Sequence, residues 1–210
     1  MTFIVAIQLE DSVVIAADNR MTIENNANER RHADTLQKIR FWQQSIMTGT
    51  GESLVLERVF KSFQQTNHPE QLPVLLREAC HLRQLEIGEH PQLKKTRLLY
   101  SQTTSSGIRL KTVGRFAEGI TANTVDPMTI ELFVFNEDIN PIYQQLIQLQ
   151  QNLCSPQQCG SMSKWINHYV MPLTMIFNKF SQADPTVSAS FDIYFQTPTQ
   201  QFLQHIEAAV

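Results

Sequence analysis

The sequence predicts an α+β protein with a four-layer αββα sandwich, in which two sheets stack face to face and helices cover both outer faces. Its segments follow the order strands, two helices, strands, two helices and a last strand. The first strands are almost continuously apolar, which is typical of strands buried on both faces. The helices are apolar along one side, as expected of helices that cover a sheet. A chain of 210 residues is long enough for one sizeable core, so we expect a single domain over residues 1–210.

Two strand pairs are expected at the start of the chain. Residues 3–9 and 13–17 are short apolar runs separated by three polar residues, which predicts a buried hairpin. Residues 25–34 are polar and charged, so we expect a loop there. Residues 39–50 then resume as two short strands that turn around Gln43 and Gln44.

The next two segments have the apolar spacing of amphipathic helices. The spacing is interrupted at His68 and Pro69, so we expect two helices and not one. Their apolar positions after Glu52 are Leu56, Val59, Phe60, Phe63, Leu72, Leu75, Leu76, Ala79 and Leu82.

The second half of the chain repeats this arrangement of strands and helices. Four strand-like segments are broken by turn residues and cover residues 98–102, 108–113, 120–125 and 130–135. A third helix is expected around residues 142–149 and a fourth around residues 166–180, with a kink at Pro172. The sequence then predicts a closing strand over residues 191–195.

The composition is that of an ordinary folded protein. Hydrophobic residues make up 42% of the chain and charged residues 18%, with a formal net charge of -3, so no nucleic-acid partner is indicated. No apolar run reaches the roughly 18 to 20 residues that cross a bilayer, and no signal-like segment opens the chain. We therefore expect no membrane partner and a cytoplasmic location.

Cysteines and histidines give no indication of a metal site or of a cofactor. Cys80, Cys154 and Cys159 match neither a disulfide framework nor a zinc spacing, so we expect reduced structural thiols. The six histidines show no catalytic-triad order and no metal-ligand spacing. The sequence also has no glycine-rich phosphate loop, so any use of ATP would need a partner protein.

The residues with the clearest chemistry begin at Thr2. A threonine hydroxyl needs a base to take its proton, and a residue at the chain start carries such a base itself, as its free α-amino group. Removal of Met1, which a small second residue permits, would expose this amine. Asp18 follows sixteen residues after Thr2, at the end of the second strand, and Lys38 precedes the next strand. Farther along, Gly49 lies in the segment Met-Thr-Gly-Thr-Gly.

Through these residues the first 58 positions resemble the catalytic half of proteasome β subunits and of their bacterial relatives HslV and Anbu, which are N-terminal nucleophile hydrolases. The resemblance implies that Thr2 is the nucleophile, that Asp18 pairs with Lys38, and that the Gly49 amide stabilises the oxyanion. An ammonium beside the α-amine disfavours the protonated amine, which makes it a better base near neutrality. Lys38 stands a few residues later than in the family, which places an insertion in residues 25–34.

The second half departs from the family pattern. The glycine-serine-glycine turn of proteasome β subunits and HslV is absent, and Asn136 stands where the family draws a polar contact from serine. The pattern of aspartate, serine and two glycines is replaced by a segment that contains Asp184 and Ser188 but no glycine. The residues after it are more similar to the end of Anbu. We interpret Arg20, Asn136, Asp184 and Ser188 as supporting residues.

The resemblance also implies a substrate pocket. Met21, Leu36 and Met47 fall where the family has side chains that contact the residue preceding the scissile bond, which implies an apolar pocket. The alternative is that all three side chains belong to the core.

Three functions are open on the sequence alone. The resemblance implies a threonine peptidase that cuts unfolded polypeptide inside a homo-oligomeric ring or spiral, with an AAA+ unfoldase as a partner. A hydrolase of small amides would use the same nucleophile in an open pocket. A non-catalytic subunit or interaction protein would keep the fold without the Thr2 chemistry, and the missing glycine motifs favour it.

Overall fold

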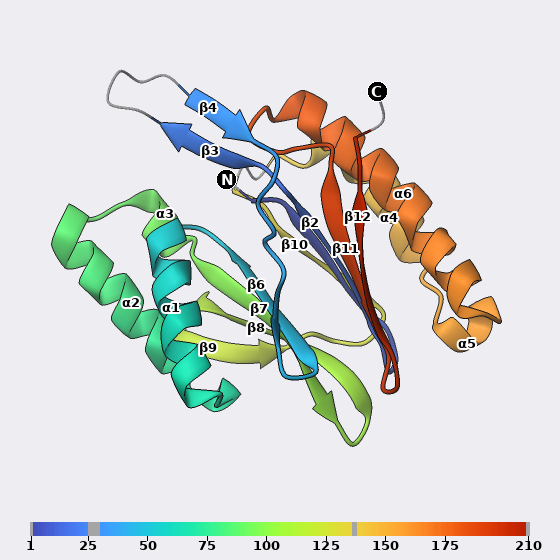
Figure 1. The fold of residues 1–210 in the computed structure, drawn as a ribbon, viewed down its shortest axis with the longest axis horizontal. Coiled ribbons are helices and arrows are strands. Elements are labelled where there is room, and N and C mark those ends of the chain that lie inside the picture. Colours follow the sequence, from blue (N-terminus) through green and yellow to red (C-terminus); the bar gives the residue numbers. More distant parts are fainter. Residues whose placement is uncertain (1, 25–29, 136–137, 209–210) are drawn as a thin grey trace.

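The computed structural model describes residues 2–24, 30–135 and 138–208 and shows a four-layer αββα sandwich (Figure 1). Two five-stranded sheets form the inner layers, and helices form the outer layers on both sides. All strand pairs within these sheets are antiparallel. This confirms the α+β class and the layer order that the sequence predicts.

The first sheet contains the start of the chain. In hydrogen-bonding order its strands are β10 (Thr129–Phe133), β1 (Ile4–Gln8), β2 (Val13–Asp18), β11 (Phe191–Gln196) and β12 (Gln201–Ile206). β1 and β2 form the predicted hairpin, in which Ile4 is paired with Ala17. Because β2 lies in the centre of the sheet, Asp18 at its end is fully buried.

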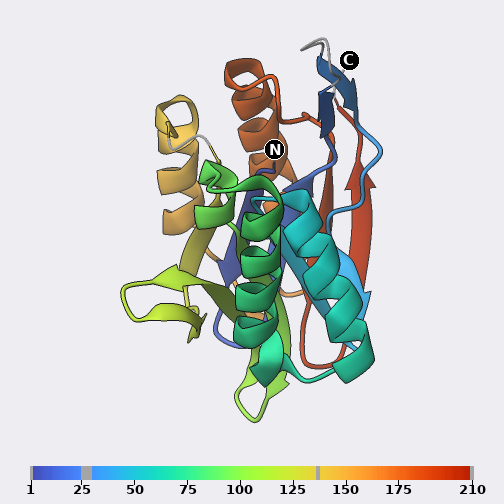
Figure 2. The same cartoon turned by 90° about the vertical axis from the view of Figure 1, so that its left-hand side faces the viewer.

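The second sheet has the order β5 (Arg40–Trp42), β6 (Ser45–Thr50), β7 (Arg97–Thr104), β8 (Gly107–Phe116) and β9 (Gly119–Thr124). Its outer face carries α1 (Ser53–Thr66) and α2 (Leu72–Ile87), which lie side by side in Figure 2. On the other side of the molecule, α4 (Tyr143–Gln151) and α6 (Met162–Ala183) cover the first sheet. The connections include the short helices α3 (Pro91–Lys94) and α5 (Pro156–Cys159) and two 3-10 turns, Pro69–Gln71 and Asn140–Ile142.

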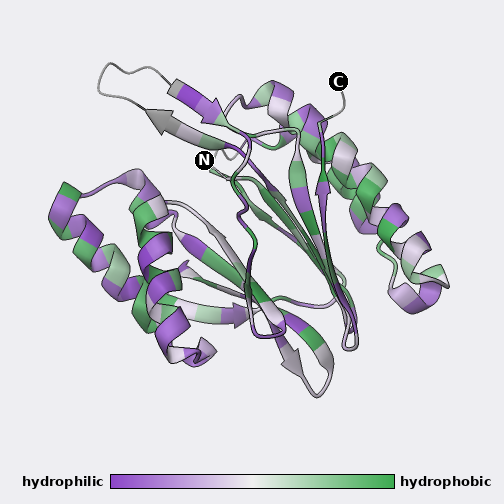
Figure 3. Cartoon of the chain, in the orientation of Figure 1, coloured by the Kyte–Doolittle hydropathy of each residue, from purple (hydrophilic) through white to green (hydrophobic). Residues whose placement is uncertain are grey.

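The apolar side chains of the first strand are divided between two clusters, because successive side chains of a strand point to opposite faces. Phe3, Val5 and Ile7 pack in the cluster that contains the buried residues of α4 and α6. Ile4 and Ala6 belong to the cluster between the two sheets. A third cluster joins the second sheet to α1 and α2. Figure 3 shows hydrophobic residues along the inner strands and a mixture of hydrophobic and hydrophilic residues on the helices.

Two segments form strands that the sequence does not predict. β3 (Met21–Glu24) and β4 (Arg30–Ala33) make a separate antiparallel ribbon, and β4 falls inside the expected loop of residues 25–34. β12 follows the strand that the sequence predicts as the last one. The ribbon lies outside the two large sheets, and β12 has mostly exposed side chains. Neither therefore has the buried apolar pattern on which such a prediction depends.

Helix α6 continues through Pro172 without a break, from Met162 to Ala183. Proline removes one hydrogen bond from a helix, but Tyr169 and Leu173 on either side of it are fully buried against the first sheet. This packing accompanies an unbroken helix, and the kink at Pro172 stays a prediction. Neither α6 nor any other helix in the described part of the chain is long and apolar enough to cross a membrane.

Candidate active site

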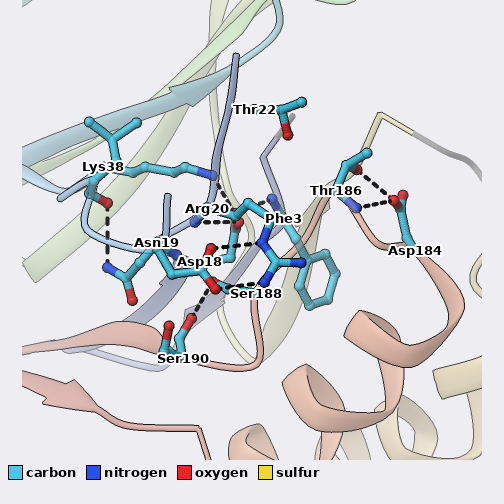
Figure 4. A network of polar contacts seen from close by, with 12 residues as sticks. Phe3, Asp18, Asn19, Arg20, Thr22, Lys38, Asp184, Thr186, Ser188 and Ser190 are labelled. Carbon is cyan, nitrogen blue, oxygen red and sulfur yellow. Dashed lines mark hydrogen bonds and ion pairs between the residues drawn. The ribbon is translucent and has the colours of Figure 1, made fainter. Parts of the chain in front are cut away.

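The carboxylate of Asp18 is the centre of a buried network of hydrogen bonds (Figure 4). Its Oδ1 accepts the amide N–H of Phe3 at 2.8 Å and the ammonium of Lys38 at 2.6 Å. Its Oδ2 accepts the amide N–H of Arg20 at 3.1 Å. A buried carboxylate is unfavourable unless donors surround it, and these three donors satisfy Asp18. The pairing of Asp18 with Lys38 that the resemblance implies is present in the structure.

Lys38 reaches Asp18 from the segment that precedes β5. Its side chain is almost fully buried, and this burial lowers the pKa of the ammonium below the ordinary lysine value. The charge of Asp18 and its hydrogen bond oppose that shift. Lys38 is therefore a cation with a paired carboxylate, and it releases its proton more readily than a lysine in water.

The position of the chain start is fixed by contacts of Phe3. Besides donating its N–H to Asp18, Phe3 accepts the Asp18 amide N–H at 3.1 Å through its carbonyl oxygen. Its ring is fully buried and stacks on Phe180 of α6 at a centroid distance of 4.4 Å. Thr2 is the neighbouring residue, so its backbone is held close to the Asp18 carboxylate.

A cavity of about 480 Å³ lies beside Thr2 and is also lined by Lys38 and Gly49. Gly49 is part of β6, and a Cβ atom at this position would lie 2.7 Å from the carbonyl oxygen of Arg97 and 2.9 Å from Cδ2 of Leu56. A side chain therefore has no room at residue 49, and the wall of the cavity is bare backbone there. The structure thus brings the predicted nucleophile, lysine and glycine to one cavity.

The apolar lining of the cavity differs in part from the expected pocket. Met21 and Leu36 line it and are partly exposed, at 38% and 36%. Met47 is only 2% exposed and packs in the cluster between the second sheet and α1 with α2. The alternative assignment to the core therefore holds for Met47, because its position in β6 turns its side chain toward these helices.

Several residues that line the cavity were not anticipated from the sequence. Leu56 and Phe60 of α1 fit the helical apolar spacing, so sequence reasoning assigns them to the core. The guanidinium of Arg40 lies over the ring of Phe60 at 4.5 Å and forms an ion pair with Glu57. These positions come together only in the tertiary structure. No local sequence pattern indicates that they line a cavity. The unanticipated lining residues are Thr22, Gln37, Arg40, Gly51, Ser53, Leu56, Glu57, Phe60 and Gln92.

Arg20 joins three separate segments near the cavity. Its Nε and Nη2 donate to the two carboxylate oxygens of Asp34 at 2.7 and 2.6 Å, and its Nη1 donates to the carbonyl oxygen of Pro185 at 2.8 Å. The Asp34 hydrogen bond raises the pKa of Arg20, and the guanidinium holds the pKa of Asp34 below its usual value. Arg20 therefore fixes the turn that follows Asp18 to the residues before β5 and after α6.

Two other supporting residues that the sequence suggests, Asp184 and Ser188, bond to neighbouring groups away from the cavity. Asp184 is buried, and its Oδ1 accepts the Thr186 amide at 2.9 Å. Ser188 is buried as well, and its Oγ accepts the Asn19 amide at 2.9 Å. Neither residue lines the cavity beside Thr2. Asn136 lies outside the described residues.

The described residues contain no group of three or more His, Cys, Asp or Glu side chains that could hold a metal ion. The groups of the predicted site that line the cavity or hold its parts in place are those already described. These are a threonine at the chain start, a buried lysine with its carboxylate partner, and a strand backbone without a side chain at Gly49.

Comparison with known proteins gives matches in structure only. No protein-family model matches the chain, and no curated protein sequence matches it significantly. The helical assembly of the Anbu complex from Pseudomonas aeruginosa matches with a TM-score of 0.70 at 14% identity, over 97% of this chain and 86% of that chain. An Anbu mutant from Hyphomicrobium sp. strain MC1 gives a TM-score of 0.67 at 15% identity, over 99% and 88% of the two chains.

A third match, Anbu (ancestral β-subunit) from Yersinia bercovieri, has a TM-score of 0.64 at 14% identity and covers 96% of this chain and 86% of that chain. These matches extend over nearly the whole chain, and identities this low are informative about the fold alone. The chain has the proteasome-β-like N-terminal nucleophile hydrolase fold of the Anbu proteins.

Proposed function

We propose that the protein is a threonine peptidase of the N-terminal nucleophile type, with Thr2 as its nucleophile after removal of Met1. The observation that carries this proposal is the Asp18 carboxylate, which accepts both the Phe3 amide and the Lys38 ammonium. These two bonds hold the chain start and a cation next to one cavity. Thr2 and Lys38 both line this cavity, which supports a mechanism in which a hydroxyl, its own α-amine and a lysine act together.

The proposed reaction divides into acylation and deacylation. In acylation the Thr2 hydroxyl oxygen attacks the amide carbonyl carbon, and the α-amine of Thr2 accepts the hydroxyl proton. The C–N bond then breaks, and the same proton passes to the departing amine, which leaves an ester on Thr2. Water attacks this ester with the α-amine again as the base, so that the acid is released and the hydroxyl is restored.

Lys38 and Gly49 support these steps by charge and by hydrogen bonding. The Lys38 ammonium disfavours protonation of the nearby α-amine, so the amine is available as a base near neutrality. The Gly49 amide is the proposed donor to the oxyanion that develops on the attacked carbonyl. One such donor typically contributes roughly 2.7 to 4 kcal/mol to transition-state stabilisation. Asp18 positions Lys38 and keeps it charged.

We further propose that the substrate is unfolded polypeptide and that the active sites lie within a homo-oligomer. The Anbu complex of Pseudomonas aeruginosa forms a helical assembly, which supports self-association of the same fold here. The chain also exposes large apolar side chains on two outer helices, which is typical of contact surfaces. These are Leu82 (52%) and Leu85 (71%) on α2, and Met171 (70%) and Met175 (58%) on α6. An AAA+ unfoldase partner belongs to this proposal through the resemblance alone.

The nucleophile is tested by mass spectrometry of untagged protein, because residues placed ahead of Thr2 would block its amine. Intact mass is expected to show loss of Met1. A β-lactone or epoxyketone probe is expected to add one probe mass to the peptide that starts with Thr2. Thr2→Ala should take up no probe, whereas Thr2→Ser should keep a hydroxyl nucleophile and react. Retention of Met1, or wild-type protein unmodified at saturating probe, would reject the threonine mechanism.

A non-catalytic subunit with the same fold is the second candidate function. It is favoured by the way in which Asp184 and Ser188 bond to neighbouring backbone and not toward the cavity. This candidate predicts that Thr2→Ala assembles and behaves as the wild type does in every assay. Size-exclusion chromatography with light scattering on both proteins, combined with the probe reaction, separates the two functions.

A further inference from the structure

Cys154 and Cys159 lie in direct contact in the turn between α4 and α6. The distance between their Sγ atoms is 2.6 Å, and both side chains are partly exposed. Sequence spacing does not predict this contact, because the two cysteines are five positions apart and no partner motif accompanies them. A disulfide can form only where the two side chains point toward each other over a short distance, and these two cysteines meet that condition.

The turn that carries the two sulfurs has a defined local structure. Pro156 begins the short helix α5, and Ser155 forms a capping box with Gln158. In this box the Ser155 amide donates to Oε1 of Gln158 at 2.8 Å, and the Gln158 amide donates to Oγ of Ser155 at 3.3 Å. The Cys159 amide donates to the Ser155 carbonyl oxygen at 3.1 Å. The backbone is therefore already arranged with the two sulfurs together.

The same turn is anchored to the first part of α6. The Cys154 amide donates to the Tyr169 hydroxyl at 2.8 Å, and that hydroxyl donates to the Cys154 carbonyl oxygen at 2.9 Å. Nε1 of Trp165 donates to the same carbonyl oxygen at 3.0 Å. Trp165 and Tyr169 are fully buried, and the Trp165 ring packs on Phe195 of β11 at 5.1 Å. A bond between the sulfurs would therefore stiffen a turn that is already tied to the core.

We propose that Cys154 and Cys159 are a reversible thiol–disulfide modification site. The oxidant is a small-molecule disulfide such as oxidised glutathione, which supplies the bond that is exchanged. One cysteine thiolate attacks a sulfur of the oxidant and releases the first small thiol. The second cysteine then attacks the resulting mixed disulfide, forms the Cys154–Cys159 bond and releases the second small thiol. Two cysteine thiols lose two protons and two electrons, and one external disulfide becomes two thiols.

The third cysteine of the chain is the natural internal control. Cys80 is buried in α2, on the opposite outer layer, and burial raises the pKa of its thiol. Burial and the neighbouring Cys154 raise the pKa of Cys159 to about 11. Because the thiolate is the reactive form, oxidation of the pair should become faster as the pH rises.

The test uses the full chain in its native state with excess oxidised glutathione, followed by acid quench, denaturation and alkylation. The wild type should lose the mass of two hydrogens and keep one alkylatable thiol, Cys80. The single proteolytic peptide that contains both Cys154 and Cys159 should be lighter by two hydrogens, and its mass should return to that of the dithiol form on reduction. Cys80→Ser should form the same bond, whereas Cys154→Ser and Cys159→Ser should not.

A thermal measurement provides the second readout. The oxidised wild type should melt at a higher temperature than the reduced form, since a cross-link restricts the unfolded chain. This difference should be absent in Cys154→Ser and in Cys159→Ser. Three alkylatable thiols in the wild type at equilibrium with the oxidant, or a persistent mixed disulfide with glutathione, would overturn the proposal. Neither result depends on whether Thr2 is a nucleophile.

Discussion

The ammonium of Lys38 donates a hydrogen bond of 2.6 Å to Oδ1 of Asp18, and the same oxygen accepts the amide of Phe3. A single carboxylate oxygen therefore connects a side chain that arrives from another segment to the backbone of the chain start. The arrangement makes the candidate site and the stability of the fold depend on the same buried charge pair. Four predictions test this arrangement and the cavity beside it.

Replacing Lys38 by methionine should destabilise the protein strongly. Asp18 would stay buried with backbone donors but without its cation, and removal of one partner of a buried pair typically costs about 3 to 5 kcal/mol. The free energy of unfolding from denaturant titration measures the change. Lys61→Met on the exposed side of α1 is the matched control, for which a change within about 0.5 kcal/mol is expected. Equal stabilities of the two variants would contradict a structural role of the pair.

The Asp18→Asn variant should shift the alkaline limb of the pH profile of kcat/KM toward lower pH. Burial lowers the pKa of Lys38, and Asp18 opposes this effect, so loss of the carboxylate charge lowers that pKa further. In the proposed mechanism activity falls as Lys38 loses its proton, and the fall should therefore begin at a lower pH. A fluorogenic peptide assay across the alkaline range measures the limb. A limb that stays in place or moves upward would argue against Lys38 as the acting cation.

The Gly49→Ala variant should lower both stability and activity. The new methyl group would lie 2.7 Å from the Arg97 carbonyl oxygen, so β6 must shift, and overpacking of this kind typically costs about 1 to 3 kcal/mol. Displacement of the Gly49 amide should reduce kcat by roughly 10²- to 10³-fold if it is the oxyanion donor. Gly114→Ala is the matched control, since the atoms nearest its Cβ would belong to the side chain of Arg97 and not to backbone. Wild-type kcat in Gly49→Ala would exclude this amide from the oxyanion site.

Met21 and Met47 should respond differently to the same substitution by alanine. Met47→Ala removes a buried side chain and should cost about 2 to 5 kcal/mol of folding free energy. Met21→Ala should change stability by no more than about 0.5 kcal/mol, because the side chain is partly exposed at the cavity. Its effect should be a higher KM for peptides with a large apolar residue before the scissile bond. A stability loss in Met21→Ala as large as that in Met47→Ala would place Met21 in the core.

The hairpin of β1 and β2 pairs residues that are close in sequence, and for that reason the sequence predicts it. Thr2 precedes β1 and Asp18 ends β2, so both lie at the open end of the same hairpin. The hairpin alone therefore brings them together. Lys38 is different, because it comes from a separate segment. Its place beside Asp18 follows from the family resemblance and not from any spacing that physics dictates.

Other parts of the site depend on packing that no sequence window contains. Met21 and Met47 differ in burial. The register of β6 turns the Met47 side chain inward, whereas Met21 starts an exposed ribbon. Asp34 becomes the partner of Arg20 only when the ribbon folds back. Gln92 reaches the cavity from α3, far along the chain. Such contacts depend on how segments far apart in the sequence pack against one another. Hydrophobic periodicity gives no information about this packing.

The pairing of β2 with β11 has a consequence for the order of events during synthesis. Asp18 is paired with Phe191, and the turn after it is held by Ser188 and by the bond from Arg20 to Pro185. A growing polypeptide that has not yet reached these residues lacks one neighbour of the strand that ends in Asp18. Thr2, the proposed nucleophile, is made almost two hundred residues before Phe191, which completes the frame around Asp18. An incomplete chain would thus carry Thr2 without an organised cavity. Any peptidase activity could begin only after the residues of β11 have been made.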